Sequence, residues 1–213
     1  MTDYPVPDIK PGERCLAVGR TGSGKSLWCR WILSRSRQKW TIIDLKHDPC
    51  WSDFGLIIDK LPDTKKLLKL FVDSQFIVIR PKIHLIDSID DWILYIHDEI
   101  DNIGLCVDEL YFISSNGRCG PGLLAWLTRG RVRKQSFLGG TQRPAWITKF
   151  CYSESSYFAI FDLNLLEDRK RVFEFVGKET VLTNPDEFFW RWYIVKKAKL
   201  LLYAPIKVKS FAL

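Results

Sequence analysis

Eight residues near the start of the chain carry its clearest chemical signal. Residues 19 to 26 fill all four fixed positions of the phosphate-binding pattern G-x-x-x-x-G-K-[ST]. In such a loop the glycines permit a tight turn of inward-pointing N–H groups, Lys25 reaches the β- and γ-phosphates, and the Ser26 hydroxyl binds Mg²⁺. The octet therefore predicts a nucleoside triphosphate site. Its residues are Gly19, Arg20, Thr21, Gly22, Ser23, Gly24, Lys25 and Ser26.

The residues on both sides of this octet support the interpretation. Residues 15–18 form a short apolar run typical of a buried strand, and residues 25–34 have the composition of a helix. A helix that begins at the loop would direct the positive end of its dipole toward a bound anion. A chance match in a glycine-rich turn would not require this strand–loop–helix context.

The second chemical signal is a pair of acidic residues that follows another apolar run. Residues 104–109 read Gly-Leu-Cys-Val-Asp-Glu. Asp108 at the end of a parallel strand would hold Mg²⁺ together with Ser26, and Glu109 would polarise the attacking water as general base. A strand that simply ends in surface acids is the alternative. An Asp-Glu pair also favours hydrolysis over transfer to a small acceptor.

A third polar group stands at the end of the next predicted strand. Residues 136–140 are apolar or small, and Thr141-Gln142-Arg143-Pro144 follows. Gln142 in this position would lie beside the γ-phosphate, where it would orient water or report the state of the nucleotide. A polar strand end followed by a proline turn is the alternative for this segment.

Other nucleotide-dependent classes match less well. A GTPase needs Asn-Lys-x-Asp after the Mg²⁺-binding strand, whereas residues 45–48 lack the asparagine and come too early. Asp53-Phe54-Gly55 matches a protein-kinase triplet, but no accompanying catalytic loop is present. Adenine is thus favoured as the base by exclusion.

Composition sets broad limits. The chain has 213 residues, 46% of them apolar and 27% charged, which is ordinary for one globular domain. Its apolar runs are too short for a membrane span, and the N-terminus does not resemble a secretion signal. Six scattered cysteines without a C-x-x-C pair, and three distant histidines, argue against disulfides or zinc. We expect an intracellular protein that is not secreted.

The net charge of +7 is compatible with a polyanionic partner. Residues 129–134 concentrate four cations in six residues. Such a run is equally compatible with an ordinary solvated surface.

The alternation of strand-like and helix-like segments predicts an α/β fold with a mostly parallel sheet flanked by helices. We expect one domain over residues 1–213, with a core at about 12–165 and a C-terminal helix and β-hairpin at about 166–213. Predicted strands cover 15–18, 40–45, 76–80, 103–107, 136–140, 157–161, 188–195 and 200–203. Predicted helices cover 25–34, 89–100, 122–132 and 165–175.

The order of these motifs resembles that of the FtsK–HerA superfamily of DNA-pumping P-loop ATPases. The resemblance rests on the phosphate-binding octet, the apolar-Asp-Glu strand end, Gly130-Arg131, and the Thr-Gln-Arg-Pro segment. Residues 42–46 (Ile-Ile-Asp-Leu-Lys) also resemble the superfamily's Asp-Pro-Lys segment, with Leu45 in place of proline. In its short length the chain most resembles the genome-packaging ATPases of membrane-containing icosahedral viruses, of the turreted icosahedral virus and tectivirus type. The resemblance covers about residues 12–165.

This resemblance implies a RecA-like core that uses ATP and Mg²⁺ to move double-stranded DNA, independently of sequence, into a preformed capsid. It also implies a homo-oligomeric ring, hexameric or pentameric, that meets a capsid or vertex protein in the host cytoplasm or the virion. In such rings a neighbour's arginine reaches the γ-phosphate, and Arg131 is the first choice, with Arg129 second. The glycine-rich loop at 114–122 would face the pore, with Arg118 on DNA phosphates. For Arg131 and Arg129 the alternative is contact with the phosphate backbone of DNA or simple solvation, and for Arg118 it is an ordinary glycine-rich surface loop.

Three other functions stay open at this point. One is a conjugation, plasmid-transfer or phage-morphogenesis (zonula-occludens-toxin-like) ATPase of the same superfamily, although those usually carry a membrane helix. Another is a nucleotide kinase whose arginine-rich lid would be residues 129–133; Glu109 and Gln142 argue against it. The last is a nucleotide-binding scaffold without catalysis.

Overall fold

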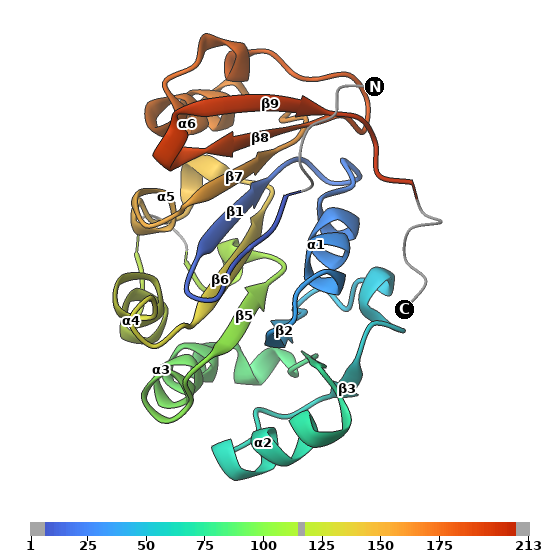
Figure 1. Ribbon diagram of the computed structural model, residues 1–213, viewed down its shortest axis with the longest axis vertical. Coiled ribbons are helices and arrows are strands. Elements are labelled where there is room, and N and C mark those ends of the chain that lie inside the picture. The colour runs from blue at the N-terminus through green and yellow to red at the C-terminus, as the bar shows by residue number, and fades with distance from the viewer. Residues whose placement is uncertain (1–6, 115–117, 208–213) are drawn as a thin grey trace.

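The computed structural model describes residues 7–114 and 118–207, which form one twisted nine-stranded sheet in the order β3-β4-β2-β5-β6-β1-β7-β8-β9 (Figure 1). Strands β1 to β7 pair in parallel, and β8 and β9 add an antiparallel hairpin beside β7. The predicted mostly parallel α/β sheet is confirmed. The strands are β1 Arg14–Val18, β2 Lys39–Ile43, β3 Leu56–Ile58, β4 Phe76–Ile79, β5 Ile103–Val107, β6 Ser136–Thr141, β7 Tyr157–Ile160, β8 Trp190–Ile194 and β9 Lys199–Tyr203.

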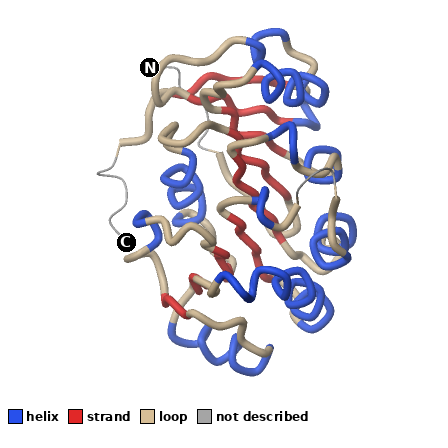
Figure 2. The backbone as a smooth tube through the Cα atoms, turned by 180° about the vertical axis from the view of Figure 1, so that it is seen from behind, coloured by secondary structure: helices blue, strands red, loops and turns tan. Residues whose placement is uncertain are grey.

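Helices cover both faces of this sheet (Figures 1 and 2). Helix α1 packs on one face, whereas α2, α3, α4 and α6 contribute to the core on the other. Within the described ranges, no helix combines the length and apolarity needed to cross a membrane. The helices are α1 Lys25–Ser34, α2 Thr64–Asp73, α3 Ile89–Glu99, α4 Pro121–Arg129, α5 Phe150–Ser153 and α6 Leu166–Val176.

The central strands are mostly apolar because they are buried on both faces. In β1, Leu16 and Val18 belong to the core under α3 and α4, whereas Cys15 and Ala17 belong to the core under α1. Successive side chains of a strand point to opposite faces, so a strand covered on both sides needs apolar residues at every position. This explains why the sequence shows continuous apolar runs rather than alternation.

The sequence analysis missed strand β3, helix α2 and the four-residue helix α5. Strand β3 has three residues at the edge of the sheet, and two of them are exposed, so it leaves little apolar signal. Helix α2 has a narrow apolar stripe, of which Leu67 and Phe71 are buried, between exposed lysines. Its capping residue is Asp63, whose side chain accepts a 2.7 Å hydrogen bond from the N–H of Lys66.

Helix α4 ends at Arg129, three residues before the predicted position. Residues 131–134 turn instead, and Lys134 takes a φ of 56°. The N–H of Gln135 then donates to the carbonyl of Gly130 at 2.8 Å, which starts the path into β6. This tight turn places the arginine-rich segment at the amino end of the sheet's strands.

The strand order brings four carboxyl ends together. β6 lies between β1 and β5, and β2 lies on the far side of β5. In the register of the sheet, Val18 pairs with Thr141, and Val107 pairs with Gly139 on one side and with Ile43 on the other. Ligands of open α/β sheets bind at such carboxyl ends, so the loops that follow these strands are the candidate site.

The C-terminal hairpin is joined to α1 by aromatic packing. The Trp190 ring lies 5.4 Å from Trp28 of α1, 6.2 Å from Phe161 and 4.5 Å from Tyr203, measured between centroids. Trp190 is only 1% exposed. Trp28 is fully buried as well. The hairpin therefore shares its core with the helix that follows the phosphate-binding loop.

Replacing Trp190 by alanine should lower the free energy of unfolding by about 3–5 kcal/mol, because it opens a large cavity between α1 and the hairpin. Chemical denaturation followed by circular dichroism would measure this loss. The control is Leu202→Ala in β9, where the side chain is half exposed and should change stability by less than about 0.5 kcal/mol. Equal effects of the two substitutions would contradict this account of the core.

Candidate nucleotide and catalytic site

The phosphate-binding octet forms the turn between β1 and α1, as the sequence predicts. Gly22 and Gly24 have φ angles of 76° and 88°, in the left-handed region that glycine adopts without strain. Gly24 stands directly before α1, whose first N–H groups are free for an anion. At Gly19 an added Cβ would come within 2.5 Å of Ser23 Oγ, so the close turn also requires glycine there.

The loop is anchored to the ends of both neighbouring strands. The N–H of Gly19 donates to the carbonyl of Thr141 at 3.1 Å, and that of Arg20 donates to the carbonyl of Asp162 at 2.8 Å. The Arg20 guanidinium also forms an ion pair with the Asp162 carboxylate. The sequence analysis missed this anchor, because nothing in the chain order shows that β7 lies next to β1.

The interior of the loop fits an anionic ligand. Lys25 is 4% exposed and lines a cavity with Arg20, Thr21 and Ser26. Ser23 is equally buried, and its hydroxyl has no hydrogen-bond partner among the described residues. A buried ammonium and an unpaired buried hydroxyl are costly without a ligand to satisfy them.

Asp108 and Ser26 meet at the base of this cavity. Ser26 Oγ donates to Asp108 Oδ2 at 3.3 Å, and Asp108 Oδ1 has no hydrogen-bond partner within the described part of the chain. Burial raises the pKa of Asp108, an effect that the nearby positive charge of Lys25 opposes. A buried carboxylate and a hydroxyl are hard oxygen donors of the kind that Mg²⁺ prefers, so these two residues fit the predicted metal.

Glu109 and Gln142 also come together. The buried Glu109 carboxylate accepts a 3.2 Å hydrogen bond at Oε1 from the N–H of Gln142. Thr21 of the loop donates its hydroxyl to Gln142 Oε1 at 2.5 Å. The other Glu109 oxygen pairs with Lys46 Nζ at 2.5 Å. The predicted general base, the predicted γ-phosphate contact and the loop are therefore in direct contact.

This close approach depends on glycines in β6. An added Cβ at Gly140 would lie 2.6 Å from the carbonyl oxygen of Asp108, and one at Gly139 would lie 2.4 Å from Leu110 Cδ1. The end of β5 can therefore lie against β6 only because these two residues have no side chain.

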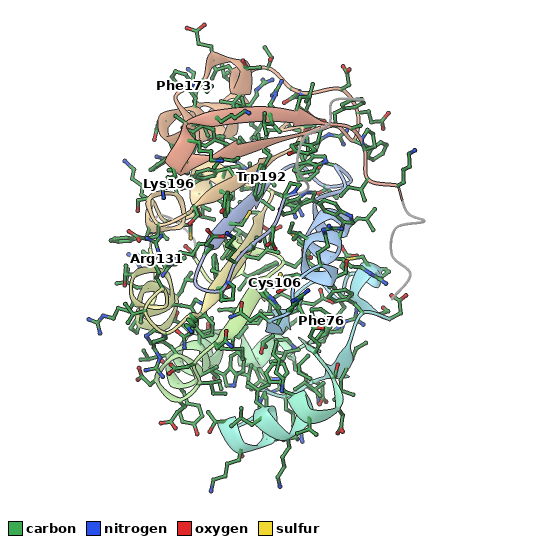
Figure 3. All side chains as sticks on the ribbon, viewed as in Figure 1. Phe76, Cys106, Arg131, Phe173, Trp192 and Lys196 are labelled. Atoms are coloured by element: carbon green, nitrogen blue, oxygen red, sulfur yellow. The ribbon has the colours of Figure 1, made fainter. Side chains whose placement is uncertain are left out.

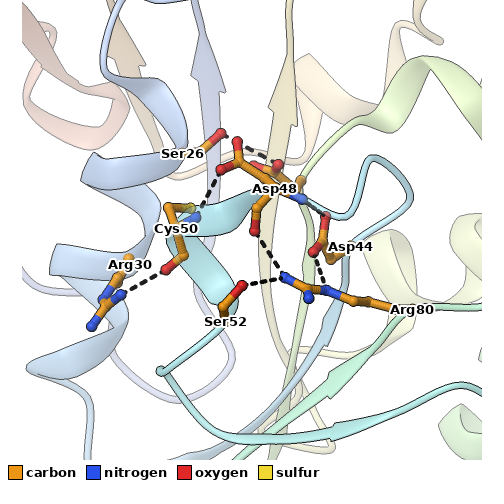
Figure 4. Close-up of polar contacts among 8 residues, drawn as sticks. Ser26, Arg30, Asp44, Asp48, Cys50, Ser52 and Arg80 are labelled. Carbon is orange, nitrogen blue, oxygen red and sulfur yellow. Dashed lines mark hydrogen bonds and ion pairs between the residues drawn. The ribbon is translucent and has the colours of Figure 1, made fainter.

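The loop after β2 completes the wall of the cavity, and most of its contacts were missed by the sequence analysis. Asp44 is fully buried and accepts hydrogen bonds from Arg80 Nε at 2.8 Å and from the N–H of Asp48 at 3.0 Å (Figure 4). Arg80 also donates to the carbonyl of Asp48 at 2.9 Å. Lys46 and Asp48 line the same cavity as the phosphate loop. The polar run that ends β2 was a visible signal, but its position beside β5 was not.

The predicted arginines do not join this site within one chain. Arg131 lies in the turn between α4 and β6, at the amino end of the strands, whereas the phosphate loop follows their carboxyl end (Figure 3). Arg129 and Arg131 are exposed and have no hydrogen bond or ion pair from their side chains to the described residues. Arg118 is exposed as well, and residues 115–117 of its predicted pore loop lie outside the described residues.

Comparison with known proteins supports the same chemistry. The chain is 33% identical, over 174 residues, to the DNA packaging ATPase P9 of Enterobacteria phage PRD1. The matched region covers 77% of this chain and 70% of the phage protein. No family model matches the chain.

Solved structures share the fold. The genome packaging NTPase B204 of Sulfolobus turreted icosahedral virus 2, in complex with sulfate, superposes with a TM-score of 0.76. That match has 17% sequence identity and covers 93% of this chain and 99% of that one. The pCW3 conjugation coupling protein TcpA gives a TM-score of 0.56 at 16% identity, over 90% of this chain but only 59% of that protein.

The burial of Asp108 predicts a stability cost that depends on pH. Its folded-state pKa is raised, so ionisation costs stability as the pH rises from 3.8, its ordinary value, through the folded value. Asp108→Asn should therefore unfold at higher temperature than the wild type at neutral pH. The difference should shrink as the pH is lowered and the wild-type carboxyl takes up its proton.

Thermal unfolding across a pH series without nucleotide or Mg²⁺ would test this. Asp101→Asn is the control, because its carboxylate is 69% exposed and its pair with Arg133 lies at the surface. A destabilised Asp108→Asn at neutral pH would show that the carboxylate is already compensated without a ligand.

Proposed function

This chain belongs to the family of viral DNA-packaging ATPases, and we propose that it binds ATP with Mg²⁺ and uses hydrolysis to move double-stranded DNA into a preformed capsid. The relative in phage PRD1 is named a DNA packaging ATPase. The neighbours solved with AMPPCP and with ATP-γS are genome packaging NTPases of the same fold. Adenine nucleotide is thus the substrate that we infer for the cavity.

One observation carries the proposal. The carboxyl ends of β1, β5 and β6 meet at the phosphate loop. Ser26 contacts Asp108 at 3.3 Å, and the Glu109 carboxylate accepts a 3.2 Å hydrogen bond from the Gln142 N–H. A scaffold that only bound nucleotide would not need a buried carboxylate next to the γ-phosphate contact. A hydrolase needs it to accept a proton from water.

The residues have distinct roles in this reaction. Water attacks the γ-phosphorus, the bond to the bridging oxygen of ADP breaks, and the water's proton passes to Glu109. Lys25 and the loop N–H groups stabilise the charge that builds on the phosphate oxygens, and Gln142 orients the water. Ser26 and Asp108 would hold Mg²⁺, which supplies further neutralisation of that charge.

The position of Arg131 supports a ring. Its own phosphate loop lies at the opposite end of the strands, so it would serve the site of another subunit. Contact between the amino end of one sheet and the carboxyl end of the next is heterologous, and such contacts form a ring when the rotation between subunits closes. We therefore propose a hexamer, or a pentamer, in which Arg131 stabilises transition-state charge in the neighbouring site and Arg129 is the second candidate.

DNA contact is proposed through charge alone. The net charge of +7 and the exposed Arg118 would act on phosphates, giving binding that is independent of sequence and weakened by salt. The ring would act at a capsid or vertex protein, in the host cytoplasm or as part of the virion.

Purified protein should hydrolyse ATP faster when double-stranded DNA is present. Glu109→Gln should bind ATP normally and lose at least about a hundredfold in kcat, because no base remains for the water proton. Lys25→Ala should weaken ATP binding itself, since the loop loses its buried cation. Phosphate release and binding of a fluorescent ATP analogue measure these two effects.

Arg133→Ala serves as a control, because Arg133 already pairs with Asp101 in its own chain and should leave kcat close to the wild-type value. Transfer of the γ-phosphate to a nucleotide acceptor without DNA would contradict the proposal and favour a kinase.

Arg131→Ala should lower kcat by on the order of a thousandfold while ATP affinity is retained. The trans arrangement makes a further prediction. Co-expressed Arg131→Ala and Lys25→Ala subunits should regain activity, because an intact phosphate loop can then meet an intact arginine at their shared interface. Arg129→Ala, tested in the same way, shows which arginine is needed. Absence of activity in the mixed assembly would contradict an arginine supplied by the neighbour.

A further inference from the structure

The ion pair between Lys46 and Glu109 is not required by the hydrolysis described above and even opposes it. Glu109 Oε2 lies 2.5 Å from Lys46 Nζ, and Oε1 accepts from the Gln142 N–H. With an ammonium on Oε2 and an N–H on Oε1, fewer lone pairs of the carboxylate are open to accept a proton from water. We propose that Lys46 is a positioning residue that restrains Glu109 and releases it when Lys46 turns toward the γ-phosphate. This proposal rests on the role of Glu109 in the proposed function.

The backbone that carries Lys46 is firmly fixed. Asp44 binds both Arg80 and the N–H of Asp48, which closes the loop after β2 over four residues. His47, with φ at 54°, makes the turn. These contacts hold the backbone beside the site, and the four-carbon side chain of Lys46 is the part with freedom to turn. The environment allows that movement, because the Lys46 side chain is 31% exposed whereas that of Glu109 is 5% exposed.

Lys46 also faces the ligand. It lines the same cavity as Lys25, Ser26 and Gln142, the residues expected around the terminal phosphate. A bound γ-phosphate would bring negative charge that competes with Glu109 for the Lys46 ammonium. In a partly buried site this attraction is stronger than in bulk water, so the competition can shift the side chain. ADP lacks that phosphate and would leave Lys46 on Glu109.

The Gln142 contact fixes the other half of the carboxylate. When Lys46 leaves, Glu109 Oε1 stays hydrogen-bonded to the Gln142 N–H, and only Oε2 becomes free to accept the water proton. The Gln142 side chain is in turn held by Thr21 of the phosphate loop. Glu109 is thus freed at one oxygen while the other keeps it aligned with the residues that contact the nucleotide.

The restraint predicts a gain of activity, which a merely structural ion pair does not. If the released form is a minority of the ATP-bound enzyme, removing Lys46 should raise DNA-independent kcat by about threefold to tenfold. Lys46→Met and Lys46→Gln are the test variants. The second retains a hydrogen-bond donor for the buried Glu109 carboxylate, in case the protein does not fold when that donor is lost. Lys46→Arg keeps the charge and should behave like the wild type. Lys69→Met, at an exposed position of α2, is the matched control.

A double-mutant cycle shows whether Lys46 acts through Glu109. In a Glu109→Gln background, Lys46→Met should produce no gain, because there is no carboxylate left to release. Steady-state phosphate release, with thermal unfolding measured on each variant, gives the required values. Hydrolysis without DNA is the readout, so a failure of DNA to stimulate the wild type would count against the proposed motor function and not against this restraint.

Two results would overturn the proposal. A fall of kcat in Lys46→Met to the level of Glu109→Gln would show that the ammonium stabilises the reaction itself. Unchanged kcat in both test variants, with a lower unfolding temperature, would show a purely structural pair. A gain in both that vanishes in the Glu109→Gln background would support it.

Discussion

The site depends on one structural constraint, which is the hydrogen-bonded register of β6 between β1 and β5. Through it the carboxyl end of β6 lies between the phosphate loop and the acidic end of β5. Gly139 and Gly140 make that approach possible, since side chains there would collide with Leu110 and with the backbone of Asp108. The contact of Ser26 with Asp108 and the contacts of Gln142 with Thr21 and Glu109 follow from this adjacency.

Stability and chemistry are in tension at this point of the molecule. The fold buries Asp108, Glu109 and Lys25 at the end of a sheet whose strands are otherwise apolar. A buried charge costs free energy unless it is paired, and Asp108 is paired with little more than a hydroxyl. Two large cores of aromatic and aliphatic side chains, one on each face of the sheet, supply the stability that allows this arrangement.

The sequence predicted those parts of the site that short segments encode. The phosphate loop, Asp108 and Gln142 each follow an apolar run, and the parallel fold is what such alternation favours. The contacts of Lys46, Arg20 and Arg80 could not be predicted in the same way. They depend on which strands are neighbours, and strand order is fixed by long-range packing that local patterns do not contain. Strand β3 was missed because an exposed edge strand needs no apolar run.

The aromatic cluster around α1 has a practical consequence for observing this protein. Trp28 lies one helical turn after Lys25, and its ring contacts Trp190 and Trp192 of the C-terminal hairpin. Indole emission responds to small changes in the packing and polarity around the ring. A ligand that tightens the start of α1 would therefore alter the fluorescence of a neighbouring group of tryptophans. The chain thus carries an intrinsic optical reporter within one helical turn of its phosphate-binding lysine.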